Sequence, residues 1–155
     1  MSAMVKIKRA EPGDSVKLLP LVAAYWEYES ISGFDQSRVG PPLERLLATP
    51  GLGAGWIAYQ DKVAIGYLLS VYVFSLEHLG LTAEIDEFFV LPFGRSSGVG
   101  SELLGAAESE FVRIGCTNVS LQLSRANDAA RRFYRRSGFA ERSGYDLLDK
   151  MLHAD

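Results

Sequence analysis

The chain has 155 residues, of which 48% are hydrophobic, 23% charged and 11% aromatic. These proportions exclude a disordered or collagen-like chain and indicate one globular domain spanning residues 1–155. Sixteen basic and nineteen acidic residues leave a net charge of −3, which argues against nucleic acid or an anionic membrane as a partner.

Few residues are available for disulfide or metal chemistry. The single cysteine, Cys116, cannot form an intramolecular disulfide or a Cys-rich zinc site, and His78 and His153 cannot form a metal site alone. The sequence has no apolar run of 18 residues and starts without the apolar segment of a signal peptide. We therefore expect a cytoplasmic protein with no metal and no membrane partner.

The first half of the chain predicts a strand, two helices and three further strands. Alternation indicates a short strand at Val5–Lys8, and helical spacing runs from Leu18 to about Ser30, although Pro20 suits only a first helical turn. Gly, Pro and Ser residues predict a loop over Ser30–Pro42 before a short helix at Leu43–Ala48. The three expected strands are Gly55–Gln60, Val63–Leu76 and Thr82–Val90.

The second half predicts two helices that alternate with strands. Apolar residues recur about every four positions from Val99 to Ile114, and Gly115 then supplies a left-handed C-terminal cap. A strand is expected at Val119–Leu123, a helix at Asn127–Ser137 with Asn127 as its N-cap, and a final strand at Tyr145–Leu152. This order predicts a mixed α/β fold with one central sheet.

The most informative segment joins the strand that ends at Val90 to the helix that begins near Val99. Gly98 and Gly100 let the backbone approach a ligand closely, and the helix start offers unpaired N–H groups to an anion. A dinucleotide-binding fingerprint fails because Leu103 replaces its third glycine, and Gly105 is not followed by the Lys-Ser/Thr of a P-loop. The segment predicts a phosphate or diphosphate loop; the alternative is a glycine-rich turn without a ligand.

Two motifs stand out in the second half of the chain. The first, Arg-x-x-Gly-x-Gly over residues 95–100, follows Val-x-Pro, and the second, Asn-x-x-Ala-x-x-Phe-Tyr-x-x-x-Gly-Phe, spans residues 127–139. Both resemble motifs of the GNAT superfamily of N-acetyltransferases. The resemblance covers the chain from about Ala83 to Phe139. It implies the GNAT fold, a mixed and mostly antiparallel central sheet with helices on both faces and splayed central strands.

The resemblance also implies acetyl-CoA as the cofactor. In this superfamily the pantetheine arm pairs with the strand before the loop, and the loop amides hold the diphosphate. The residues so implied are Phe88, Phe89, Val90, Arg95, Ser96, Ser97, Gly98, Val99, Gly100, Ser101 and Asn127.

The implied reaction is direct attack of a primary amine on the acetyl thioester. The amine, with a pKa of about 10, must first lose a proton, and the leaving thiolate benefits from a proton donor. The resemblance assigns the donor role to Tyr134, which could otherwise be a half-buried packing residue. Glu87 and then Asp86 are candidates for the base or a cation anchor, and strand alternation points them to opposite faces; alternatively they only mark a strand edge.

An acidic and aromatic set before the second predicted helix would suit a cationic amine, and we select Trp26, Glu29 and Phe34 as substrate-binding candidates. The alternative for these residues is a solvated or packing role. We expect a small-molecule acceptor. A protein or peptide N-acetyltransferase and a non-catalytic acyl-CoA-binding module stay open as alternatives, and the resemblance adds the expectation of a homodimer.

Overall fold

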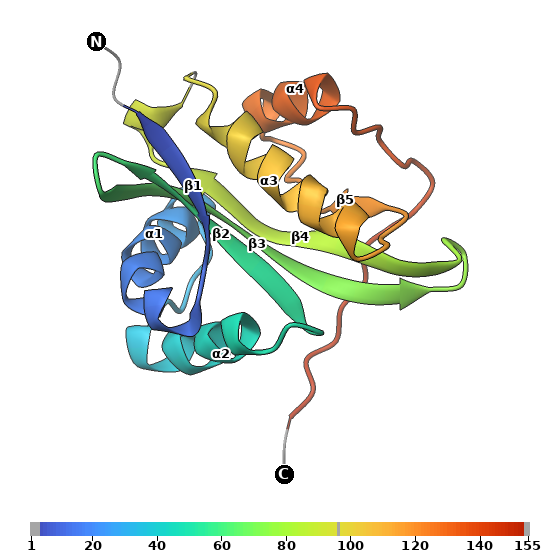
Figure 1. The fold of residues 1–155 in the computed structure, drawn as a ribbon. Coiled ribbons are helices and arrows are strands. Elements are labelled where there is room, and N and C mark those ends of the chain that lie inside the picture. The colour runs from blue at the N-terminus through green and yellow to red at the C-terminus, as the bar shows by residue number, and fades with distance from the viewer. Residues whose placement is uncertain (1–3, 96, 154–155) are drawn as a thin grey trace. The chain divides into compact units, whose positions relative to one another are not determined.

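The computed structural model describes residues 4–95 and 97–153, which form two compact units, one ending at Gln122 and the other starting at Leu123. The first unit is built on a five-stranded sheet whose strands follow one another in chain order (Figure 1). The strands are β1 (Val5–Arg9), β2 (Gly53–Gln60), β3 (Val63–Ser75), β4 (Gly80–Val90) and β5 (Val119–Leu121). Neighbours from β1 to β4 pair antiparallel and β4 pairs parallel with β5, which confirms the mixed, mostly antiparallel sheet.

Helices cover both faces of this sheet, as expected (Figure 1). On one face lie α1 (Ser15–Tyr28), which follows a short 3₁₀ turn at Pro12–Asp14, and α2 (Gln36–Ala48); on the other lies α3 (Val99–Arg113), which follows a 3₁₀ turn at Pro92–Gly94. Within residues 4–95 and 97–153, none of the helices combines the length and apolar character needed to span a bilayer.

The two layers of helices bury different sides of the strands. Leu18 and Val22 of α1 share an apolar cluster with Ile57, Tyr67 and other residues that face them. On the opposite side, α3 places the Phe111 ring edge-on against Trp56 and Tyr72, with ring centroids 5.9 and 6.2 Å away. Residues that alternate along β2 and β3 therefore belong to two separate apolar layers.

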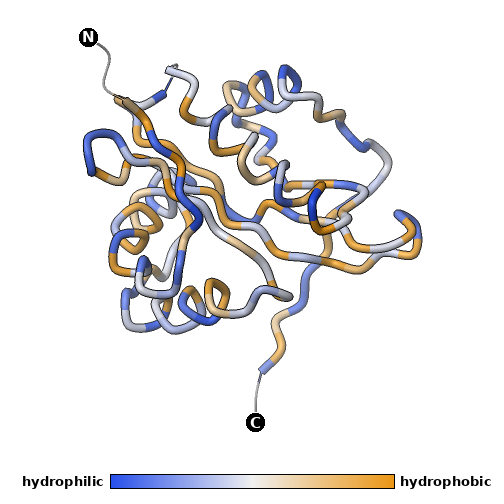
Figure 2. Tube along the Cα trace, in the orientation of Figure 1, coloured by the Kyte–Doolittle hydropathy of each residue, from blue (hydrophilic) through white to orange (hydrophobic). Residues whose placement is uncertain are grey.

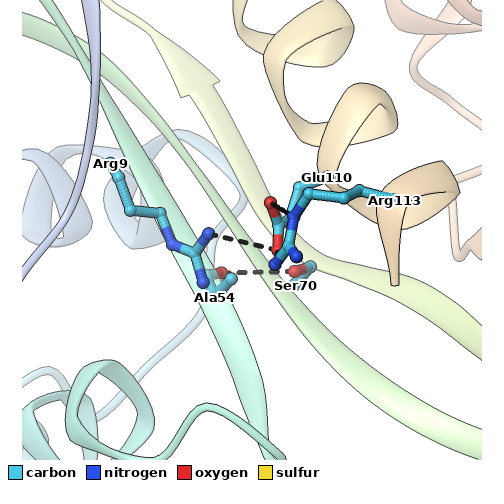
Figure 3. Close-up of polar contacts among 5 residues, drawn as sticks. All are labelled: Arg9, Ala54, Ser70, Glu110 and Arg113. Atoms are coloured by element: carbon cyan, nitrogen blue, oxygen red, sulfur yellow. Dashed lines mark hydrogen bonds and ion pairs between the residues drawn. The ribbon is translucent and has the colours of Figure 1, made fainter.

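An ion pair also links α3 to the first strand (Figure 3). Glu110 of α3 lies 3.8 Å from the Arg9 guanidinium and accepts hydrogen bonds from Arg113, and the Arg9 guanidinium stacks 5.0 Å from the centre of the Trp56 ring. Close by, the buried Ser70 hydroxyl donates to the Ala54 carbonyl at 3.2 Å. These contacts give Arg9, Ser70 and Glu110 polar partners within the unit.

The helix α2 starts well before the expected Leu43, because its first turn is capped by a residue placed in the predicted loop. The Asp35 side chain accepts the Ser37 N–H at 2.8 Å, so the helix begins at Gln36 and continues through Pro41 and Pro42. Similarly, α1 starts at Ser15 and carries Pro20 in its interior. Both helices tolerate these prolines because the apolar side of each helix packs on the sheet and offsets the lost backbone hydrogen bonds.

The strand β4 carries one extra residue relative to β3. Ile85 lies opposite Ser70 and Glu87 lies opposite Leu69, so Asp86 is unmatched and forms a β-bulge. Directly opposite residues share a face. Ile85 therefore lies on the α3 face with Ser70, whereas Glu87 lies on the face of α1 and α2 with Leu69. Regular alternation would have placed Ile85 and Glu87 together.

The pairing of β4 with β5 is short. It joins Ala83–Ile85 to Val119–Leu121, and among the described residues β5 offers no ladder partner to Asp86–Val90. The backbone edge of β4 therefore opens immediately after Ile85. This divergence between neighbouring strands is the splay implied by the resemblance.

The second unit contains α4 (Asp128–Arg136), close to the predicted helix. The Asn127 side chain accepts the Ala130 N–H at 3.1 Å, and Gly138 follows with a φ of +97°, so both predicted helix-end signals are confirmed. The expected final strand over Tyr145–Leu152 is wrong. Apolar and polar residues follow one another there (Figure 2), but no ladder forms and Leu148 is 89% exposed. Sequence pattern alone does not provide the neighbouring strand on which β structure depends.

Replacing Gly53 with alanine should destabilise the first unit. A Cβ at Gly53 would lie 2.1 Å from the Ser70 carbonyl oxygen, a backbone atom that moves only if the sheet distorts. We expect a loss of about 1–3 kcal/mol in the free energy of unfolding, the usual cost of overpacking. Chemical denaturation would measure it, with Gly51→Ala as the control because a Cβ there meets nothing within 4 Å. Equal stability of the two variants would contradict this account of β2.

Candidate functional site

The carboxylate of Glu87 is held between α1 and β3. Its Oε2 accepts a hydrogen bond from the Trp26 indole N–H at 2.8 Å, and its Oε1 accepts one from the Tyr67 hydroxyl, also at 2.8 Å. Tyr67 is fully buried and Glu87 half-buried. Burial raises the pKa of Glu87 and the two hydrogen bonds oppose that rise without cancelling it.

Asp86 lies in the same electrostatic environment as Glu87. Its charge raises the pKa of Glu87 and also those of Tyr25 and Tyr67, the phenols on which Glu87 acts, although alternation predicted opposite faces for the two carboxylates. The bulge at Asp86 interrupts that alternation. Asp86 is accessible to solvent, yet the protein around its carboxyl group desolvates it enough to raise its pKa. Both acids therefore hold protons more readily than ordinary surface carboxylates.

The residues predicted to bind the acceptor substrate lie at or just after the end of α1, near these carboxylates. The Trp26 ring packs edge-on against Phe34 with centroids 5.7 Å apart, and Glu29 is the C-cap residue of α1. Burial, and then the charges of Glu29, Glu87 and Asp86, raise the pKa of Tyr25 to about 12. Trp26, Glu29, Phe34, Asp86 and Glu87 thus belong to one neighbourhood with a negative field. Among the described residues, no three His, Cys, Asp or Glu side chains are arranged to hold a metal ion.

The predicted diphosphate loop leads directly into α3. The 3₁₀ turn at Pro92–Gly94 is followed by Gly98, which caps α3 with a φ of +85° and no side chain. The Ser97 hydroxyl donates to the Gly94 carbonyl at 2.7 Å and closes the loop, while Val99 is buried at the first helical position. Gly100 and Ser101 follow in the first turn, whose N–H groups have no partner within the helix. Ser96, also predicted to bind the cofactor, lies outside the described residues.

Arg95 contacts the β4 edge and the end of α1. Its Nε donates to the Val90 carbonyl at 2.8 Å, and its guanidinium lies 4.9 Å from the centre of the Tyr28 ring and 5.4 Å from that of Phe89. Because the Leu91 N–H donates to Ile65 of β3, the Val90 carbonyl in the same peptide unit points away from β3. It therefore faces the edge that β5 leaves open.

In the second unit, the two remaining predicted residues lie on or beside α4. Asn127 is its N-cap, and the ring of Tyr134 packs between Phe133 and Phe139 with centroids 5.4 and 5.5 Å away. On the same helix, Arg131 and Arg135 both donate to Glu141.

A family model described as "Acetyltransferase (GNAT) family" matches residues 19–139. The chain belongs to this family. The match includes the open strand β4, the loop before α3 and the whole of α4, and it confirms the resemblance identified from the two motifs.

Individual relatives of this GNAT protein agree with that assignment. It is 24% identical over 148 residues to the uncharacterized N-acetyltransferase YhfO of Bacillus subtilis (strain 168), which covers 91% of this chain and 93% of YhfO. It is 32% identical over 85 residues to the aminoalkylphosphonate N-acetyltransferase of Salmonella typhimurium, 55% of each chain. Among solved structures, an aminoglycoside N-acetyltransferase AAC(6')-Iy in complex with CoA matches with a TM-score of 0.85 at 20% identity, covering 98% of both chains.

The protein is therefore an acetyltransferase that uses acetyl-CoA. The loop geometry fits that cofactor, because a Cβ added at Gly98 would meet nothing within 4 Å and the first N–H groups of a helix favour an anion. Beyond Ile85 the backbone of β4 is not part of the ladder with β5, where an amide-containing arm could align with it.

Two contacts of this site were not predicted from the sequence. Tyr67 precedes Leu68 and Leu69 in an apolar part of β3, and this pattern predicts a core residue. Its hydroxyl reaches the Glu87 carboxylate because Tyr67 pairs with Phe89, two residues beyond Glu87. Tyr28 belongs to the aromatic end of α1, but its contact with Arg95 joins residues 67 positions apart. Neither partner has a local sequence signal.

Proposed function

We propose that this acetyltransferase moves the acetyl group of acetyl-CoA to a primary amine of a small cationic molecule by direct attack on the thioester. The observation that carries the proposal is the carboxylate pair, in which Glu87 is fixed by two hydrogen bonds and Asp86 lies next to it at the bulge. Such a pair attracts an ammonium group and can also take a proton from it.

The named relatives support a small amine as the acceptor. One acts on aminoalkylphosphonates and a structural neighbour is an aminoglycoside acetyltransferase, so amino groups on small polar molecules recur among them. The aromatic rings of Trp26 and Phe34, together with Glu29, would favour a cationic acceptor at the end of α1.

The cofactor site proposed here combines the β4 edge with the α3 loop. Acetyl-CoA supplies the acetyl group as an activated thioester. Backbone groups of Phe88 and Val90, on either side of Phe89, align its arm, and Asn127 contributes a polar contact. The diphosphate is held by the N–H groups of the loop and first helical turn, from Arg95 through Ser96, Ser97, Gly98, Val99 and Gly100 to Ser101.

Two proton movements complete the reaction. The acceptor binds as an ammonium ion and loses a proton to the Asp86 and Glu87 pair, whose raised pKa values bring them closer to the working pH of a general base. Tyr134 then donates its phenolic proton to the leaving thiolate. A phenol with an ordinary pKa of about 10 is protonated at neutral pH and is suited to that role.

A thiol-release assay with a panel of acceptors tests this proposal. The panel holds an aminoglycoside, an aminoalkylphosphonate, aliphatic diamines, a lysine-containing peptide and a peptide with a free N-terminus. We expect release with at least one small amine and little with the peptides. Release with peptides only would favour a protein N-acetyltransferase, and tight CoA binding without release from any acceptor would favour a non-catalytic acyl-CoA-binding module; either result would overturn the proposal.

A further inference from the structure

We propose that Trp26 and Tyr67 are positioning residues that hold Glu87 as a fixed anchor for the acceptor ammonium and leave proton removal to Asp86. The inference rests on the proposed amine acetylation and divides its two carboxylates into separate roles.

The geometry around Glu87 restrains the whole carboxylate group. Each of its oxygens receives one hydrogen bond of 2.8 Å, Oε2 from the indole N–H of Trp26 and Oε1 from the hydroxyl of Tyr67. The donors come from α1 and β3, so rotation of the carboxylate would break contacts to two separate elements. Each oxygen still has a lone pair for a further donor, and an ammonium group is such a donor.

The donors themselves cannot follow a moving carboxylate. Tyr67 is fully buried, packs edge-on against Tyr25 at 6.4 Å and belongs to the cluster beneath α1. Trp26 is held by Phe34, edge-on at 5.7 Å. A carboxylate bound to two rigid aromatic donors is a preorganised anchor, because the conformational entropy of fixing it is lost when the protein folds and not when the substrate binds.

The electrostatic environment gives the two hydrogen bonds a second effect. Glu87 faces Trp26 and the Tyr25 phenol from α1, the Tyr67 phenol from β3 and the Asp86 carboxylate on β4, while Glu29 adds negative charge beside Tyr25. Burial and Asp86 raise the pKa of Glu87, whereas Trp26 and Tyr67 lower it. The two donors therefore favour the ionised form that an ammonium anchor requires.

Asp86 has the properties that the proton-accepting role needs. It occupies the bulge, where no residue of β3 lies opposite it, and it is accessible to solvent. The N–H bond of the bound ammonium breaks, the proton passes to an Asp86 carboxylate oxygen, and the electron pair stays on nitrogen for attack on the thioester carbonyl. Solvent access lets Asp86 return this proton to water after each turnover.

Kinetics of Tyr67→Phe and Trp26→Phe test the positioning role. Tyr67→Phe keeps its ring, Trp26→Phe replaces the indole with a smaller aromatic ring, and each loses one donor, so we expect KM for the amine to rise by about tenfold, the equivalent of one charge-assisted hydrogen bond, with KM for acetyl-CoA unchanged. In the pH profile of kcat/KM, the acidic limb should move to higher pH by about one unit, because the loss of a donor makes Glu87 harder to ionise. Tyr72→Phe and Trp56→Phe are matched controls, since both rings pack on Phe111 at the other face of the sheet.

Carbon NMR titration of the glutamate side chains in the substrate-free protein provides an independent readout. We expect the Glu87 resonance, assigned with Glu87→Gln, to titrate at higher pH in Tyr67→Phe and Trp26→Phe than in the wild type. An unchanged titration in both variants overturns the proposal. A shifted titration in a protein that acetylates no amine supports the positioning role while the proposed function fails, so the two failures are distinguishable.

A double-variant comparison covers the case in which loss of a donor merely loosens the fold. In the Glu87→Gln background, Tyr67→Phe should no longer move the acidic limb, because the carboxylate through which it acts is gone. An equal shift in both backgrounds would show that Tyr67 acts by another route and would overturn the proposal.

Discussion

Replacing Tyr134 with phenylalanine is expected to lower kcat by about 10²- to 10⁴-fold, the usual contribution of a positioned general acid. The change removes the hydroxyl alone, because the ring packs between Phe133 and Phe139 and a phenylalanine keeps both contacts. The Kd for CoA should change little, so the loss appears in turnover. Steady-state kinetics and calorimetric titration with CoA would measure the two quantities.

The matched control is Tyr145→Phe, which removes the same hydroxyl from a tyrosine in the same unit that is 73% exposed. Its kcat should equal that of the wild type. Full activity in Tyr134→Phe would remove Tyr134 as the acid and leave water to protonate the thiolate.

The Gly98→Asp variant is expected to weaken binding of CoA strongly while leaving α3 intact. A carboxylate at this N-cap interacts favourably with the helix N-terminus, but it occupies the space proposed for the diphosphate. Two like charges about 4 Å apart repel by about 1 kcal/mol in water and about 4 kcal/mol near a protein surface, so Kd for CoA should rise by at least about fivefold.

The Gly98→Asn variant isolates the charge from the backbone conformation. Gly98 has a φ of +85°, and Asn and Asp are the non-glycine residues that adopt this left-handed conformation most readily, with nearly equal volumes. Both variants should therefore share any strain and differ in CoA affinity. Equal Kd values for Gly98→Asp and Gly98→Asn would contradict the assignment of this loop to the diphosphate.

The sequence predicted the parts of the protein that depend on local signals. Helix ends are such a part, because a cap residue contacts only the few residues next to it. Gly98, Asn127 and Gly138 lie at helix ends, as predicted. The resemblance carried by the loop and by α4 added the family and its cofactor, and the family match confirms both.

What could not be predicted depends on partners far apart in the chain. The hydrogen bonds of Glu87 join it to residues 61 and 20 positions away, and no periodicity indicates them. The final strand was predicted wrongly for a related reason, because the sequence over Tyr145–Leu152 does not show whether a neighbouring strand is there to pair with it. The early start of α2 was not predicted, because Gly, Pro and Ser residues indicated a loop over Ser30–Pro42 and the Asp35 cap lies within it.

The bulge at Asp86 has a practical consequence for anyone who wishes to change acceptor scope by mutagenesis. Up to that residue, even-numbered positions of β4, such as Glu84, share a face with α1; after it, odd-numbered positions such as Glu87 and Phe89 do. A combinatorial library that randomised every second codon along β4 would therefore sample the acceptor side for one half of the strand and the α3 core for the other. Deleting the Asp86 codon would remove the bulge, while Ile85 and Glu87, then adjacent, keep the opposite faces that they occupy now.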